Sequence, residues 1–331
     1  MKAIVHHEYG SADVLRLEEI EKPTPADDEV LVRVYAASVN PADWYGMKGI
    51  IVARPGGGWL KPKDPRIGGD YAGVIEGVGR KVKDFKPGDE VYGSRHGALA
   101  EYICVNKSIS PKPSNISFEQ AAAVPTAALT ALQGLRDHGK LKAGQTVLIT
   151  GAAGGVGHFA VQIAKAMGAE VTGVCRTQKL DFVRSLGADY VVDYTREDYT
   201  QTDRHYDLIL DIASTKSWSA LNRILKPSGM LILVGAPGAN KPLGPLGQIG
   251  RLMLGSLRSR QKMRFFVASF NHEDFAHMRE LIESGKMTPV LDGTYPMIEA
   301  VEAMRLLGEG HARGKLVVTM NAKEKRARIL N

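Results

Sequence analysis

The sequence predicts an α/β protein in which a β-rich domain precedes a doubly wound parallel sheet. Between residues 146 and 270, short apolar and β-branched segments alternate with segments whose apolar residues recur at helical spacing. Before residue 120, short apolar segments stand between glycine and proline turns instead. A chain of 331 residues also favours two domains over a single hydrophobic core.

The first 120 residues are expected to form short strands separated by turns. Four segments cluster or alternate apolar residues and are expected to be strands: Val30–Val34, Tyr71–Val78, Glu90–Tyr92 and Ala100–Val105. The segment Arg54–Pro65 holds three glycines and three prolines, so we expect a loop there.

From Phe118 onward the pattern becomes helical and then alternates. Glu119–Ala123 and Ala127–Gly134 are rich in alanine and are expected to be helices. The strands expected after them are Thr146–Thr150, Glu170–Val174, Tyr190–Val192, Asp207–Asp211, Met230–Val234, Arg264–Phe270 and Gly314–Met320, and the helices are near 155–167, 177–186, 217–225, 272–284 and 296–308. The segment 235–262 has little pattern, and its basic, apolar middle fits a short helix or a subunit contact.

A glycine-rich turn between the first strand of the alternating region and the helix after it predicts a dinucleotide site. The turn carries Ala152, Gly154, Gly155, Val156 and Gly157, in an AxGxxG pattern that departs from the usual first glycine. Such a turn lets backbone N–H groups approach a pyrophosphate, which also meets the positive end of the helix. The alternative is a simple tight turn, but its place between strand and helix favours the dinucleotide.

The end of the next strand indicates which dinucleotide is bound. Sites for NAD usually place an Asp or Glu there to hold the ribose 2′-hydroxyl. This chain has Arg176 and Lys179 instead, which suit a 2′-phosphate. Two solvated cations at the start of a helix are the alternative interpretation. NADPH is therefore the expected cofactor.

Composition excludes several other classes of protein. The formal charge of +7 is dispersed, and the dense basic run Lys323–Arg328 is interpreted as a solvated tail, so no nucleic acid is expected as a partner. No apolar run reaches the length of a membrane span, and the first residues do not resemble a secretory signal. Two cysteines, Cys104 and Cys175, provide no disulfide framework, so we expect a cytoplasmic protein.

Seven short motifs occur in an order that characterises one superfamily. They are Ser38–Asp43, Gly69–Gly73 with Val78-Gly79, Pro87–Gly93, Pro125–Ala131, Gly154–Gly157, Leu186–Asp189 and Gly314–Val317. With these motifs the chain resembles the medium-chain dehydrogenase/reductase superfamily, and within it the zinc-free quinone oxidoreductase (zeta-crystallin-like) branch. The resemblance implies a GroES-like catalytic domain at 1–122, an NADP-binding Rossmann domain at 123–268 and a C-terminal segment at 269–331 that returns to the catalytic domain.

The resemblance also indicates that no metal is needed. In zinc-dependent relatives a Cys corresponds to Asn40, a His-Glu pair corresponds to Gly69-Asp70, and another Cys lies near the segment Val124–Thr130. A catalytic zinc needs about three soft or imidazole ligands and an open position. None of these places offers a Cys or a His here, so we expect no metal site.

The resemblance assigns roles to residues of both domains. It places Asn40 near the nicotinamide, Tyr45 beside cofactor and substrate, and the Thr130 hydroxyl on the nicotinamide side. From the residues alone, Asn40 fits an Asx turn, Tyr45 fits an aromatic patch with Trp44, and Thr130 fits helix packing. These local interpretations stay open.

Three further residues are candidates for cofactor binding. The family places a ring such as that of Tyr194 near the adenosine phosphate, and Gly235 follows a strand at the edge where α/β sheets bind ligands. Arg313 precedes the last strand and is expected to reach the cofactor. Surface positions without a function are the alternative for Tyr194 and Arg313.

The function expected from these features is hydride transfer from NADPH to a quinone or an α,β-unsaturated carbonyl. Asn40 and Tyr45 would orient and polarise the acceptor's carbonyl. An enoyl-thioester reductase is the nearest alternative, and an NADPH-binding redox sensor or structural protein is the alternative outside enzymes. We expect a homodimer, with neither nucleic acid nor membrane as a partner.

Overall fold

A computed structural model describes residues 1–50, 58–235, 246–257 and 259–320. These residues form two compact units. Unit 1 consists of residues 1–126, 270–283 and 289–320, and unit 2 of residues 127–269 and 284–288, in each case without the gaps given above. Parts of two sequence-predicted segments, Arg54–Pro65 and 235–262, lie outside the described residues, as does the whole basic run Lys323–Arg328.

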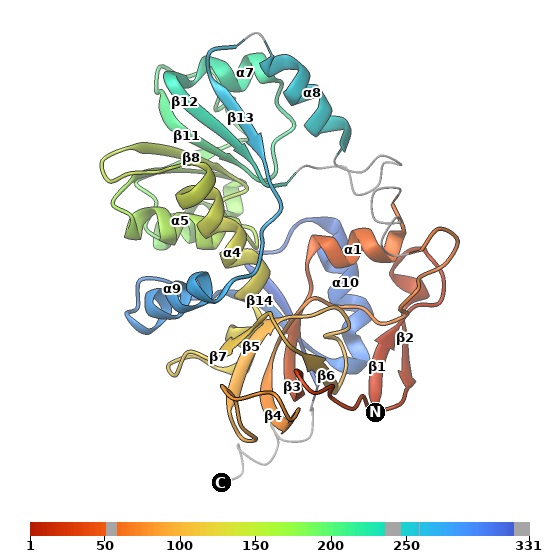
Figure 1. The fold of residues 1–331 in the computed structure, drawn as a ribbon. Helices are drawn as coiled ribbons and strands as arrows, with labels where there is room; N and C mark the ends of the chain where they lie inside the picture. Colours follow the sequence, from red (N-terminus) through yellow and green to blue (C-terminus); the bar gives the residue numbers. More distant parts are fainter. Residues whose placement is uncertain (51–57, 236–245, 258, 321–331) are drawn as a thin grey trace. The chain divides into compact units, whose positions relative to one another are not determined.

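Unit 1 is built on a seven-stranded sheet and a separate pair of strands. The sheet has the order β14-β15-β3-β4-β5-β7, with β6 also paired to β3, and β1 pairs with β2 (Figure 1). The strands of unit 1 are β1 (Lys2–Val5), β2 (Arg16–Glu19), β3 (Val30–Ser38), β4 (Asp70–Val78), β5 (Glu90–Ser94), β6 (Tyr102–Val105), β7 (Ile109–Pro111), β14 (Leu291–Pro296) and β15 (Lys315–Thr319). Its helices are η1 (Ala12–Val14), α1 (Pro41–Lys48), α3 (Phe118–Ala122), α9 (His272–Glu283), η5 (Met297–Glu299) and α10 (Ala300–Glu309).

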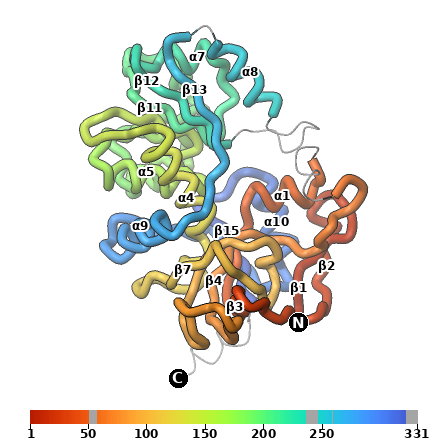
Figure 2. Tube along the Cα trace, in the orientation of Figure 1, coloured from red at the N-terminus to blue at the C-terminus, as the bar shows by residue number. Residues whose placement is uncertain are grey.

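The C-terminal part of the chain completes the sheet that the N-terminal part begins. Strand β15 pairs antiparallel with β3, with Val317 opposite Ser38, so residues almost 280 positions apart are neighbours. Figure 2 shows this end of the chain, in blue, beside the red and orange N-terminal strands. Strand β3 can sit centrally because it is apolar along nearly its whole length and is buried on both faces. Val32, Tyr71, Met304 and Val318 belong to one buried core that holds both parts together.

Unit 2 contains the predicted doubly wound sheet. Its strands have the order β10-β9-β8-β11-β12-β13, and every pair among them is parallel. They are β8 (Thr146–Thr150), β9 (Glu170–Cys175), β10 (Tyr190–Asp193), β11 (Tyr206–Asp211), β12 (Leu225–Leu233) and β13 (Lys262–Phe265). The helices are α4 (Pro125–Gln133), η3 (Gly134–His138), α5 (Gly157–Ala166), η4 (Thr177–Lys179), α6 (Leu180–Ser185), α7 (Trp218–Arg223) and α8 (Leu246–Ser256). None of the helices in the described part of the chain is long and apolar enough to cross a membrane.

The structure corrects several expected boundaries. The strand expected at Arg264–Phe270 ends at Phe265, because its pairing partner β12 ends at Leu233, which lies opposite Phe265. Strand β12 begins at Leu225, five residues before its expected start. The sequence pattern also missed β1, which pairs with a polar strand, β2, and so has no long apolar run to mark it.

Candidate functional site

The glycine turn of unit 2 is closely packed at one glycine and open at another. A side chain at Gly157 would place its Cβ 2.1 Å from the Gly151 carbonyl oxygen, so only glycine fits there. At Gly154 a Cβ would meet only that same oxygen, at 3.3 Å. Helix α5 begins at Gly157 and runs for ten residues, so its positive end lies at the turn. This glycine cradle, at the start of a helix, is where the sequence predicts a pyrophosphate, and that contact stays a prediction.

Two of the predicted cofactor-binding residues lie together at the end of neighbouring strands. Arg176 follows β9 and Tyr194 follows β10, and the Arg176 Nε donates to the Tyr194 hydroxyl at 2.5 Å. Arg176 is exposed and Tyr194 is 46% exposed. The remaining guanidinium N–H groups of Arg176 can therefore reach a phosphate, with the phenol ring holding the side chain in place.

Asp193, an acidic residue beside Tyr194, accepts hydrogen bonds from two hydroxyl groups. Asp193 ends β10 and is 5% exposed. Its carboxylate accepts from Thr195 Oγ1 at 2.6 Å and from the Thr177 hydroxyl, and these bonds lower the pKa of Asp193.

The other predicted residues of unit 2 lie on three different elements. Thr130 is half-buried on α4, and Lys179 is half-buried in η4. Gly235 follows β12, where a Cβ would lie 2.5 Å from the Ile212 carbonyl oxygen, so the backbone passes close to the end of β11. These placements leave their proposed contacts with a cofactor as predictions.

In unit 1, Asn40 lies in a buried polar cluster. It follows β3, precedes α1 and is 4% exposed. Its Oδ1 accepts from the Lys315 ammonium, and its Nδ2 donates to Asp70 Oδ2 at 3.0 Å. The amide therefore lies between a cation and a carboxylate.

Asp70 is the centre of this cluster and is fully buried. Besides the Asn40 amide, its carboxylate accepts from the Thr126 hydroxyl at 2.6 Å and from the Thr126 backbone N–H at 3.2 Å. The Ser38 hydroxyl lies 3.5 Å from Asp70 Oδ2. Thus Asn40, Asp70 and a residue of Val124–Thr130, the places where zinc-dependent relatives carry ligands, meet here through hydrogen bonds.

Two ionisable neighbours of Asn40 have shifted pKa values. Burial, together with the nearby Asp70 carboxylate, raises the pKa of Asp43 to about 7, although the Asn40 backbone N–H donates to Asp43 Oδ2 at 2.8 Å. Burial also lowers the pKa of Lys315, which the charges of Asp70 and Asp43 partly oppose. The Asp43 carboxylate caps the first turn of α1.

Tyr45 and Trp44 are adjacent on α1 and differ in their surroundings. The Trp44 ring packs against Gly308 of α10. A Cβ at Gly308 would lie only 2.3 Å from the Trp44 ring. Tyr45 is half-buried, burial raises its pKa, and its hydroxyl has no hydrogen-bond partner among the described residues. Arg313, the other candidate in this unit, is exposed just before β15.

Sequence reasoning missed Lys315, Thr126 and Asp211 as notable groups. Lys315 is 4% exposed at the start of the apolar strand β15, and the sequence marks it only as part of the Gly314–Val317 motif. Asp211 ends β11 and is fully buried, and its Oδ2 has no hydrogen-bond partner among the described residues. An Asp after a run of buried apolar residues is the corresponding signal in the sequence.

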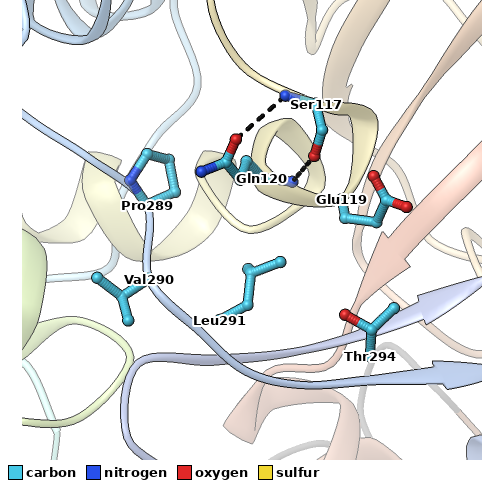
Figure 3. A pocket seen from close by; sticks show the side chains of 7 residues that line it. All are labelled: Ser117, Glu119, Gln120, Pro289, Val290, Leu291 and Thr294. Atoms are coloured by element: carbon cyan, nitrogen blue, oxygen red, sulfur yellow. Dashed lines mark hydrogen bonds between the residues drawn. The ribbon is translucent and has the colours of Figure 1, made fainter.

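A pocket of unit 1 lies apart from the residues predicted by sequence. It has a volume of about 540 Å³ and is lined by Ser117, Glu119, Gln120, Pro289, Val290, Leu291 and Thr294 (Figure 3). Ser117 and Gln120 bond to each other's backbone N–H groups at 3.2 Å, which caps α3. Two of the polar lining residues, Ser117 and Gln120, thus serve to cap the helix.

No group of three or more His, Cys, Asp or Glu side chains in the described ranges is arranged to hold a metal ion. Asn40 and Gly69 offer neither a thiolate nor an imidazole at the positions that correspond to zinc ligands.

A β-rich unit combined with a doubly wound sheet and a glycine turn defines a class of two-domain, dinucleotide-dependent dehydrogenases and reductases. Residues 26–114 match the family described as "Alcohol dehydrogenase GroES-like domain", and residues 186–318 match the family described as "Zinc-binding dehydrogenase". The chain belongs to the medium-chain dehydrogenase/reductase superfamily, which confirms the resemblance seen in its motifs.

Similar proteins span nearly the whole chain. A chloroplastic NADPH-dependent alkenal/one oxidoreductase of Arabidopsis thaliana is 36% identical, over 96% of this chain and 79% of that protein. A quinone oxidoreductase from Coxiella burnetii is 30% identical with a TM-score of 0.86, over 97% of this chain and 99% of that one. The Escherichia coli quinone oxidoreductase complexed with NADPH is 26% identical with a TM-score of 0.81, over 97% and 100% of the two chains.

Proposed function

We propose that this protein is a zinc-independent, NADPH-dependent oxidoreductase that reduces quinones and α,β-unsaturated carbonyls. The observation that carries the proposal is the glycine cradle of unit 2 with the Arg176–Tyr194 pair at the end of the next strands. The acceptor class is supported by relatives whose names specify quinones and alkenals or alkenones.

The cofactor would be held by residues of unit 2. NADPH supplies the hydride when it is bound. The turn Gly154–Gly157 binds the pyrophosphate through backbone N–H groups, and Arg176, with Lys179, binds the 2′-phosphate. Tyr194 orients the Arg176 guanidinium by accepting from Nε. Thr130 and Gly235 are proposed as further cofactor contacts in unit 2, and a cofactor contact of Arg313 stays the prediction made from the sequence.

The acceptor's carbonyl would be oriented by Asn40 and Tyr45. Negative charge grows on the carbonyl oxygen during reduction, and donors held in place for it stabilise the transition state more than the ground state. Asn40 offers the second hydrogen of Nδ2, since the first goes to Asp70. Tyr45 would offer its phenol proton, and either Tyr45 or solvent would protonate the product.

The test is NADPH consumption by the purified protein with a quinone, an enone, an enoyl thioester or no acceptor. We expect oxidation with the first two, at rates well above the rate without acceptor. Turnover with the enoyl thioester alone would replace this function with that of an enoyl-thioester reductase. NADPH binding without turnover in any arm would favour a sensor or structural protein.

We also propose that the protein is a homodimer. Strand β13 lies at an edge of the parallel sheet, and Phe265 and Val267 near its end are 45% and 81% exposed. Unpaired edge strands with apolar side chains associate readily with another copy. Light scattering should give twice the chain mass, and Val267→Lys should give the single-chain mass if this edge forms the contact.

A reducing compartment such as the cytoplasm is proposed from cysteine usage. Cys104 and Cys175 are both free thiols. Disulfides are rare in reducing compartments, and no feature of this chain uses one. Cell fractionation tests the proposal, and recovery of the protein in an organelle would contradict it.

A further inference from the structure

Side chains from three neighbouring strands converge at one end of the seven-stranded sheet in unit 1. Lys315 begins β15, Asn40 follows β3 and Asp70 begins β4. Val317 lies opposite Ser38 on one side of β3, and Ser38 lies opposite Asp70 on the other. This register brings the three side chains together although Lys315 is 275 residues from Asn40.

The charges on either side of Asn40 fix the orientation of its amide. The carbonyl oxygen faces the Lys315 ammonium, and Nδ2 faces Asp70 Oδ2 at 3.0 Å. Rotating the amide by half a turn would set its NH₂ against an ammonium and its oxygen against a carboxylate. Both contacts would be repulsive in a buried environment, so only one orientation is stable.

Lys315 is tied to this position by more than one bond. Its Nζ also donates to the Val39 carbonyl oxygen at 3.2 Å, and the residue is 4% exposed. A cation on the oxygen of an amide withdraws electron density from the nitrogen, which makes the amide N–H groups better donors. Lys315 therefore acts on both the direction and the donor strength of the Asn40 amide.

Gly69 leaves space beside this amide. A Cβ at position 69 would lie 3.8 Å from Asn40 Nδ2 and 3.6 Å from Asp43 Oδ1, and Gly69 is only half-buried. Position 69 therefore places no side-chain atom beside Nδ2. One of its two hydrogens goes to Asp70, so the second is left for a ligand.

We propose that Lys315 is a positioning residue for Asn40: with Asp70 it holds the amide so that the second hydrogen of Nδ2 is donated to the carbonyl oxygen of the acceptor. The proposal rests on the function proposed above and names a residue through which Asn40 acts. It assigns no proton transfer to Lys315.

A double-mutant cycle in kcat/KM tests the proposal. The wild type is compared with three variants: Asn40→Ala, Lys315→Met and the double variant. The substrates are NADPH and an enone, and the assay temperature lies well below the melting temperature of each protein. We expect each single variant to lose about tenfold or more and the double variant to lose no more than Asn40→Ala, because Lys315 acts through the amide. Losses that multiply in the double variant would show that Lys315 acts independently of Asn40, which overturns the proposal.

A second buried lysine of unit 1 provides the matched control. The Lys112 Nζ donates to the carbonyl oxygens of Pro113 and Ile116 at 3.0 and 2.8 Å, and its side chain is 5% exposed. Lys112→Met should lower the melting temperature and leave kcat/KM unchanged. An equal loss of kcat/KM in Lys112→Met would mean that removing any buried lysine has this effect, which also overturns the proposal.

A measurement without turnover separates this proposal from the proposed function. The side-chain NH₂ of Asn40 is assigned by NMR from its absence in Asn40→Ala. We expect the Nδ2 proton that is donated to Asp70 to exchange slowly with solvent in the wild type and rapidly in Lys315→Met. Unchanged exchange overturns the proposal even if the enzyme is active, and loss of protection supports it even if no acceptor is reduced.

If Lys315→Met does not fold, the variant with Lys315→Met and Asp70→Asn removes both charges and takes its place. Its kcat/KM should fall to the level of Asn40→Ala, with rapid NH₂ exchange. Wild-type kcat/KM in this folded variant would overturn the proposal.

Discussion

Replacing Asp211 with Asn should change how the stability of the protein depends on pH. Asp211 is fully buried at the end of β11, and its Oδ1 accepts from the Thr150 hydroxyl at 2.7 Å and the Ser214 backbone N–H at 3.0 Å. Its Oδ2 has no partner among the described residues, and burial raises its pKa from 3.8 to about 6. An unpaired buried carboxylate disfavours its own charged form.

The magnitude follows from the two pKa values. The folded protein binds the Asp211 proton more tightly than the unfolded chain, so stability falls as pH rises from 3.8 to about 6 and stays lower above that. The full cost of ionisation is about 3 kcal/mol, of which about 1.4 kcal/mol develops between pH 5 and pH 8. Asn does not titrate and keeps an oxygen for Thr150 and Ser214. The stability of Asp211→Asn relative to the wild type should therefore rise by about 1.4 kcal/mol between pH 5 and pH 8.

The assay is urea unfolding of the wild type and the variant at pH 5 and pH 8. Asp207→Asn on the same strand is the control, because burial of Asp207 is outweighed by bonds from Lys226 and Thr146 that lower its pKa. Asp207 is ionised throughout this range, so its variant should lose a similar amount of stability at both pH values. A stability difference for Asp211→Asn that stays constant from pH 5 to pH 8 would refute the reasoning.

Four further outcomes are expected. Arg176→Ala should weaken NADPH binding at least tenfold and leave NADH binding nearly unchanged, since a charge-assisted contact contributes about 1.5–3 kcal/mol; equal wild-type affinities for the two cofactors in a fluorescence titration would contradict the assignment. Activity should survive exhaustive chelation, and elemental analysis should find no stoichiometric zinc; activity restored only by zinc would reverse this expectation. Gly157→Ala should lower the melting temperature strongly because its Cβ would lie 2.1 Å from a carbonyl oxygen, whereas Gly154→Ala should fold and lose mainly NADPH affinity; similar melting temperatures for both would argue against the cradle. Tyr45→Phe should reduce kcat/KM by about tenfold with a quinone and more with an enone, at unchanged NADPH affinity; a lower melting temperature with unchanged kcat/KM would make Tyr45 a packing residue.

The alternating region was the easiest part of the fold to predict from sequence. Strand β8 has the expected bounds, Thr146–Thr150, and the all-parallel order of the unit 2 sheet confirms the doubly wound arrangement. Buried parallel strands are continuous apolar runs, so their sequences identify them without knowledge of their partners. The edge strand β13 was placed wrongly because its end depends on where β12 ends, which local pattern does not encode.

The site was predictable only where its residues are close in sequence. The glycine turn and Arg176 stand within one strand–helix–strand segment, so spacing alone relates them. The pairing of Arg176 with Tyr194 needed the parallel register of β9 and β10, and the contact of Asn40 with Lys315 needed the return of the C-terminal strand to β3. Hydrogen bonds across such distances depend on topology, which no local motif specifies.

The buried charges of unit 1 are costly for stability alone. Moving an ammonium and a carboxylate out of water costs several kcal/mol each, and well-packed apolar residues in their place often give an equally stable or more stable protein. Lys315 and Asp70 do not even touch through a direct hydrogen bond among those described; the Asn40 amide lies between them and bonds to both. An ion pair optimised for stability would bring the ammonium and the carboxylate into direct contact. Asp70 also accepts from Thr126 and Lys315 also donates to the Val39 carbonyl oxygen, but the Asn40 amide is the group that bonds to both charges. This shared contact is the physical reason for proposing that the cluster orients Asn40.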